Sequence, residues 1–199
     1  MIRTAIKFIQ KELEAFMVER SQDIPYIVDQ VVDMRSIVQP NGNLNIDDNK
    51  HITLMLAGIE EERREGKRPH FIPGNNNERL ILNPPVELDL YLLFLAHSSN
   101  YETALDDLSD VAAFFQANNV FDARQYPSMN DKVEKPWRMI ERLSFRIFNL
   151  TFEQQNNLWA MLGIKYIPNI LYKVNMLTIF DTKSKQKSAP ITEINMIEN

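Results

Sequence analysis

The sequence contains no cysteine among its 199 residues. This absence excludes disulfide bonds, thiolate metal sites, iron–sulfur clusters and a cysteine nucleophile, and it agrees with a reducing cytosol. Glycine is scarce as well, with five residues, and neither the GxxxxGK(S/T) nor the GxGxxG phosphate-binding pattern occurs. We therefore expect no glycine-cradled nucleotide, no other cofactor and no bound metal.

Long apolar runs are also missing. The longest, residues 90–96, has the length of a strand, whereas a membrane-spanning helix needs about 20 apolar residues. Charged side chains at Lys7, Lys11 and Glu12 interrupt the apolar residues of the N-terminus, so the sequence predicts no secretory signal peptide. We expect no membrane contact.

Positive charge is in the minority. Lys and Arg number 22 against 27 Asp and Glu, which gives a net charge of −5 at pH 7. Proteins that bind nucleic acid usually carry a basic stripe that neutralises phosphates. The basic clusters here, at residues 63–64 and 183–187, are short, so nucleic-acid binding is not expected.

The sequence does contain the material of a folded core. Hydrophobic residues make up 44% of the chain and include 11 Phe, which is typical of a globular protein. A length of 199 residues fits one domain with a sizeable core. We therefore expect a single domain over residues 1–199.

Two helices are predicted from apolar residues at the helical period. The first covers residues 2–20. The second follows a capping box formed by Ser99 and Glu102, and it places Asp106, Asp107 and Asp110 on its solvated side. Its expected buried stripe is Tyr101, Leu105, Leu108, Ala112 and Phe115.

A third helix and several strands complete the predicted order. Thr151 and Gln154 form the capping box of the third helix, and Gly163 ends it. Strict alternation over residues 142–150 places Ile147 on the inner face of a strand, together with two other apolar residues. The remaining predicted strands cover residues 26–35, 52–59, 86–96 and 170–181.

This order indicates an α+β fold. The few strand–helix alternations favour a mostly antiparallel sheet covered by the N-terminal helix and two further helices. Residues 66–78, with two prolines and three consecutive asparagines, are predicted to form a flexible polar loop. Residues 182–199 are predicted to form a C-terminal tail with a possible edge strand at 191–197.

The sequence shows no pattern typical of an enzyme. His51, His70 and His97 lack metal-ligand spacing such as HExxH and are interpreted as ordinary surface or strand-end residues. The carboxylates of residues 60–62 have the chemistry of an acid–base or cation site, but a solvated strand end explains them better. We expect no enzyme, and a small cytosolic hydrolase with such a carboxylate site stays open as an alternative.

Several segments in one order resemble a known family. They are residues 52–63, 83–94, 101–105, 108–116, 120–121, 158–163, 166–168 and 171–174. This ordered set is similar to the N-terminal domain of tube-terminator, or cap, proteins of extracellular contractile injection systems of the antifeeding-prophage and virulence-cassette kind. The resemblance covers nearly the whole chain.

The resemblance implies a structural function. In that family the domain is similar to phage tail terminators, and six copies form a ring that closes the inner tube and anchors the end of the sheath. The expected partners are therefore further copies of the chain, the tube protein and the sheath protein. The chain would be assembled in the bacterial cytoplasm and then form part of a phage-tail-like particle. A related tail adaptor is the alternative.

The residues of the predicted loop and tail are the expected subunit interface, because neither segment is needed for the core. The candidate residues are Arg68, His70, Phe71, Asn75, Asn76, Ile191 and Ile194.

Overall fold

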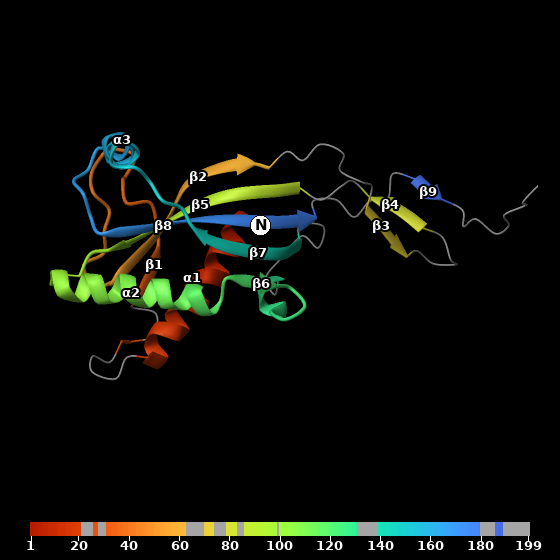
Figure 1. Cartoon of the computed structure of the whole chain (residues 1–199), viewed down its shortest axis with the longest axis horizontal. Coiled ribbons are helices and arrows are strands. Elements are labelled where there is room, and N and C mark those ends of the chain that lie inside the picture. The colour runs from red at the N-terminus through yellow and green to blue at the C-terminus, as the bar shows by residue number, and fades with distance from the viewer. Residues whose placement is uncertain are drawn as a thin grey trace, which may run out of the picture.

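A six-stranded sheet forms the centre of the protein (Figure 1). The computed structural model describes residues 1–20, 26–27, 31–62, 70–73, 79–82, 86–98, 100–130, 139–179 and 186–188. In spatial order, the strands of the sheet are β1 (Val32–Met34), β2 (Ile52–Glu61), β5 (Val86–Ala96), β8 (Asn169–Ile179), β7 (Met139–Ile147) and β6 (Val120–Asp122).

The sheet is antiparallel except at one edge. β1 pairs with β2 in parallel, whereas every other neighbouring pair is antiparallel. In the central strand β5, Phe94 lies opposite Leu54 of β2 and Ile170 of β8. Both edge strands, β1 and β6, are three residues long. The predicted fold class, a mostly antiparallel α+β sheet covered by helices, is confirmed.

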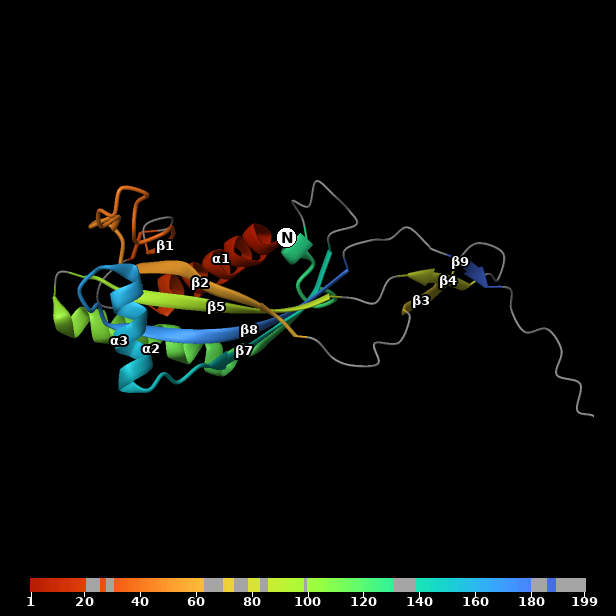
Figure 2. The ribbon, with the colours of Figure 1, turned by 90° about the horizontal axis from the view of Figure 1, so that it is seen from above.

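Helices cover both faces of this sheet (Figures 1 and 2). α1 (Ile2–Arg20) and α2 (Tyr101–Ala117) pack on one face, and α3 (Phe152–Leu162) packs on the other. Consecutive residues of a strand point to opposite faces, so Leu92 and Phe94 enter the first core while Leu93 and Leu95 enter the second. None of the described helices is both long and apolar enough to cross a membrane.

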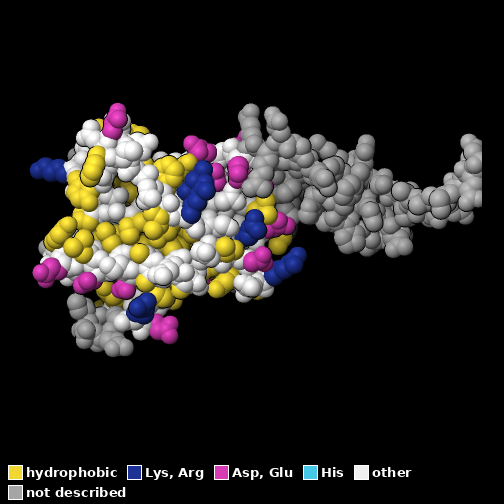
Figure 3. Space-filling view, viewed as in Figure 1, with side chains coloured by type: hydrophobic (Ala, Val, Ile, Leu, Met, Phe, Trp, Pro, Cys, Tyr) yellow, Lys and Arg dark blue, Asp and Glu magenta, His cyan; other side chains and the backbone are white. Residues whose placement is uncertain are grey.

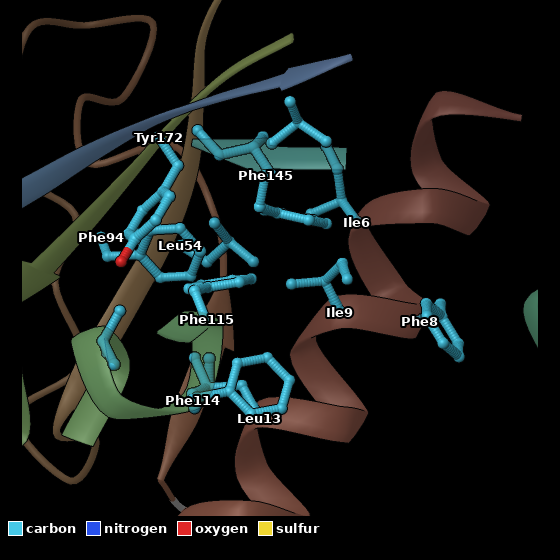
Figure 4. Packing of buried hydrophobic residues seen from close by; sticks show 14 of the residues in the cluster. Ile6, Phe8, Ile9, Leu13, Leu54, Phe94, Phe114, Phe115, Phe145 and Tyr172 are labelled. Atoms are coloured by element: carbon cyan, nitrogen blue, oxygen red, sulfur yellow. The ribbon is translucent and has the colours of Figure 1, made fainter. Parts of the chain in front are cut away.

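Aromatic rings fill the larger core (Figure 4). The ring centroid of Phe115 lies 4.4 Å from that of Tyr172, 4.5 Å from that of Phe145 and 5.3 Å from that of Phe94. These contacts join α2 to three strands of the sheet, and α1 contributes Ile6, Ile9 and Leu13 from the opposite side. Such dense packing makes the core sensitive to loss of volume at its centre.

The helix ends predicted from the sequence agree with the structure for α1 and α3 but not for the start of α2. α1 covers the predicted residues, and the capping box of Thr151 with Gln154 begins α3. Gly163 ends α3 with φ of 67°, a left-handed conformation that glycine adopts without strain. The predicted cap of α2 is wrong by one residue, because the Asn100 side chain accepts the hydrogen bond from the Glu102 amide. Ser99 lies outside the described residues.

The predicted buried stripe of α2 is also partly wrong. Tyr101 is 64% exposed and Leu105 is 43% exposed. Asp107, expected on the solvated side, is completely buried. The buried residues of α2 are Ala104, Asp107, Leu108, Val111, Phe114 and Phe115. The buried face is therefore rotated toward Asp107, whose carboxylate finds partners inside the protein.

Two strand predictions need correction. β1 begins at Val32, and the described residues Tyr26 and Ile27 precede it outside any strand. Ile147, predicted to face inward, is 53% exposed at the end of β7. The sequence of β7 alternates as predicted up to Phe145, and its last two residues lie beyond the part that pairs with β6.

A second, three-stranded sheet includes part of the predicted loop. It consists of β3 (His70–Pro73), β4 (Arg79–Leu82) and β9 (Gln186–Ser188), in the order β3-β4-β9. The prediction of irregular structure over residues 66–78 is therefore wrong for His70–Pro73, since antiparallel pairing with β4 stabilises a strand there. The predicted edge strand at 191–197 lies outside the described residues.

We expect Phe115→Ala to lower the free energy of unfolding by about 3–5 kcal/mol, because it leaves a cavity among four aromatic neighbours. Phe152→Ala removes the same atoms at a position that is 92% exposed, and it should change the free energy by no more than about 0.5 kcal/mol. Urea denaturation measures both values. Equal effects of the two substitutions would contradict the described packing.

Candidate functional site

The outer surface of α3 carries large exposed apolar side chains beside a groove. Phe152 is 92% exposed, Met161 is 68% exposed and Tyr166, just after the helix, is 60% exposed. The first and last of these line a groove of about 490 Å³ against Trp159. Hydrophobic side chains gather over α3 and above α2 in Figure 3. We call Phe152, Trp159, Met161 and Tyr166 the α3 surface.

Trp159 closes the base of this surface. Its ring is 7% exposed and meets the Tyr166 ring edge-on, with 5.6 Å between the centroids. Its Nε1 is buried and, among the described residues, has no hydrogen-bond acceptor. Trp159 therefore belongs to the smaller core. Exposed apolar side chains in such a patch are typical of surfaces that other proteins cover.

A charged patch lies on the same sheet face, beyond α3. Lys173 Nζ lies 2.7 Å from Asp89 Oδ2 and 4.0 Å from Glu60 Oε2. The Tyr91 hydroxyl donates to Glu60 Oε2 at 2.7 Å. Hydrogen bonding to Asp89 raises the pKa of Lys173 although burial opposes it, so this lysine stays charged. Figure 3 shows charged side chains of both signs over the strands beside α3.

The carboxylates that the sequence left open as an enzyme site contribute to this patch. Asn175 Nδ2 donates to Glu62 Oε2 at 2.8 Å and to Asp89 Oδ1 at 3.1 Å. Glu60 and Glu62 therefore each hold a neighbouring side chain on the sheet. Among the described residues, no group of three or more His, Asp or Glu side chains is arranged to hold a metal ion.

A buried polar cluster surrounds Asp107 at the end of the sheet. The Tyr26 hydroxyl donates to Asp107 Oδ1 at 2.7 Å, and Ser98 Oγ donates to Oδ2 at 2.6 Å. His51 Nδ1 lies 3.3 Å from the same Oδ2. Burial raises the pKa of Asp107, but the hydrogen bonds from His51, Ser98 and Tyr26 outweigh it, and the pKa of Asp107 is lowered overall.

This cluster contains a serine, a histidine and an aspartate, but not in the order of a nucleophilic triad. In a triad the histidine separates the serine from the carboxylate and uses a different nitrogen for each. Here Ser98 donates directly to Asp107, and His51 presents the same Nδ1 to both. The arrangement joins α2 to the end of the sheet and to the segment that contains Tyr26.

His97 extends the polar residues along the sheet end. Its Nε2 lies 2.9 Å from Thr53 Oγ1, and its Nδ1 is buried with no partner among the described residues. Burial lowers the pKa of His97, so the neutral ring is favoured in the folded protein. The sequence interpretation of His51 and His97 as ordinary strand-end residues missed these contacts, because their partners are 44 to 56 residues away.

The predicted interface residues fall at the margin of what the structure describes. His70 and Phe71 lie in β3, in the three-stranded sheet. Arg68, Asn75, Asn76, Ile191 and Ile194 lie outside the described residues. The structure therefore brings none of these side chains into a described contact, and their part in an interface stays a prediction.

The helix-covered sheet is the fold of proteins that end the tubes of contractile injection systems. The sheath/tube terminator of the PVC extracellular contractile injection system, in its extended state, matches with a TM-score of 0.60 and 15% sequence identity. The tube-terminating cap of the anti-feeding prophage matches with a TM-score of 0.58 and 14% identity. At these identities the likeness concerns the fold.

Family membership follows from the sequence. The model of the Pvc16 N-terminal domain matches residues 4–193, and the chain belongs to that family. The predicted resemblance is confirmed. The structural matches cover 100% and 99% of this chain but only 63% and 60% of the two relatives, so the chain spans about three fifths of their length. Comparison with curated protein sequences finds no match.

We expect the free energy of unfolding to fall as the pH decreases from about 7.5 to 5.5, and His97→Gln to reduce this fall. Since burial depresses the folded-state pKa of His97 below its usual value of about 6.5, its stabilising contribution is complete above that pH. The contribution is lost as the pH falls through the folded-state pKa, with a slope of at most about 1.4 kcal/mol per pH unit.

Urea denaturation at several pH values measures this difference between the wild type and His97→Gln. Glutamine keeps a nitrogen near Thr53 and does not titrate. Identical pH profiles of the two proteins would show that His97 is not held neutral by the fold.

Proposed function

We propose that the chain is a structural subunit of a cap, in which six copies form a ring that terminates the inner tube of a contractile injection particle and anchors the end of its sheath. Membership of the Pvc16 N-terminal domain family carries this proposal. The fold supports it, since two proteins with the same fold are a sheath/tube terminator and a tube-terminating cap.

The described surfaces suit a protein that works by contact. The α3 surface exposes three large apolar side chains, and such patches are typical of protein–protein interfaces. The polar cluster of Asp107 and the patch of Lys173 and Asp89 hold elements of the fold together. A rigid subunit is what a ring requires, because errors in the angle between neighbours add up around a closed symmetry.

Attachment to the sheath is proposed because the sheath/tube terminator, of which the chain covers 63%, has the same fold. A tail adaptor of the same fold is the second candidate, and it differs in position: an adaptor lies between two components, whereas a cap closes the free end of the tube.

We expect the purified chain to bind one end of preformed tubes and to stop their elongation when it is present during tube polymerisation. Negative-stain images would show six-fold density at tube ends, and light scattering would give the mass of any free ring. A protein of similar charge and mass from an unrelated family is the control. Bare tube ends at saturating protein would contradict the cap, and density at the junction of tube and baseplate alone would favour the adaptor.

A further inference from the structure

α1 and α2 carry opposite charges at the same spacing. On α1 the exposed residues Arg3, Lys7 and Lys11 recur every four positions, and we call them the basic stripe. On α2 the residues Glu102, Asp106 and Asp110 recur at the same interval, and we call them the acidic stripe. Residues four apart lie on consecutive turns of one helix face, so each stripe covers about 12 Å along its helix.

Neither stripe is neutralised within the described part of the chain. The salt bridges there involve residues of the sheet and its loops and, on α2, Asp107 with His51, but no member of either stripe. Around Asp110, burial and the charges of Asp107 and Asp106 raise its pKa, and Arg20 only partly opposes this effect. The acidic stripe thus concentrates negative charge that the described part of the chain balances only in part, through Arg20.

Apolar side chains accompany the acidic stripe. Tyr101 and Leu105, next to Glu102 and Asp106 in sequence, are 64% and 43% exposed. In Figure 3, carboxylates line the lower margin over α2, with hydrophobic side chains directly above them. Apolar anchors with charged residues at their rim are the usual composition of a protein interface. This surface of α2 therefore has the character of a docking surface, and its charge selects a basic partner.

We infer that the basic stripe on α1 of one copy docks on the acidic stripe of α2 in the next copy of the ring. The inference rests on the proposed function. It supplies the head-to-tail contact that a ring needs, in which two different surfaces of one chain meet. Like charges disfavour contact of α1 with α1 and of α2 with α2, so the stripes select this pairing over symmetric dimers.

Charge exchange tests this contact. Lys7→Glu with Lys11→Glu makes both stripes acidic, and Glu102→Lys with Asp106→Lys makes both basic. We expect each double variant to lower the occupancy of tube ends at least tenfold in negative-stain images. The quadruple variant, which carries both changes, should restore occupancy to within about twofold of the wild type. An equimolar mixture of the two double variants should restore it as well, with the copies alternating around an even-numbered ring.

The matched control is Arg142→Glu with Lys165→Glu. It lowers the net charge as much as Lys7→Glu with Lys11→Glu does, but at exposed residues of β7 and of the loop after α3. This control should cap tubes normally, and thermal melts should show that all variants fold. Wild-type occupancy in both double variants would overturn the inference and leave the cap intact. The inference would also be overturned if the double variants lost occupancy and neither the quadruple variant nor the mixture restored it. Failure of the wild type to cap would instead refute the proposed function.

Discussion

Burial of β5 on both faces is the constraint on which the rest of the structure depends. Leu92 and Phe94 require α1 and α2 on one side, and Leu93 and Leu95 require α3 on the other. Each of these four side chains is at most 1% exposed, so none of the helices can leave without exposing the central strand. Because full burial of one such side chain contributes about 1.5–3 kcal/mol, the three layers form one cooperative unit.

Buried polar groups fix how the segments join around that unit. Glu14 of α1 accepts a hydrogen bond from the Val31 amide, and Gln10 donates to the Val32 carbonyl, so α1 holds the edge strand β1. Asp107 connects α2 with Ser98 and Tyr26 in the same manner. An unpaired buried carboxylate is costly, and each of these acids therefore specifies the position of its donors. Glu14 and Asp107 thus fix the positions of the segments that pack against α1 and α2.

The sequence predicted features whose causes are local. The ends of α3 follow from Thr151 and Gly163, and the extent of β5 follows from an uninterrupted apolar alternation. It could not predict features whose causes are distant. The strand His70–Pro73 depends on pairing with β4, and burial of Asp107 depends on donors 9 to 81 residues away. The candidate surfaces were missed for the same reason: exposure of Phe152 and Tyr101 is a property of the packed layers.

The two edge strands have a further consequence for a protein that is made in many copies. β1 and β6 each offer three residues to an incoming strand, whereas open-ended growth of a sheet needs a longer, flat edge. Random side-by-side joining of newly made chains through these two strands is thereby discouraged. Copies can then accumulate at high concentration and still meet through side chains, which discriminate between right and wrong neighbours far better than backbone groups do.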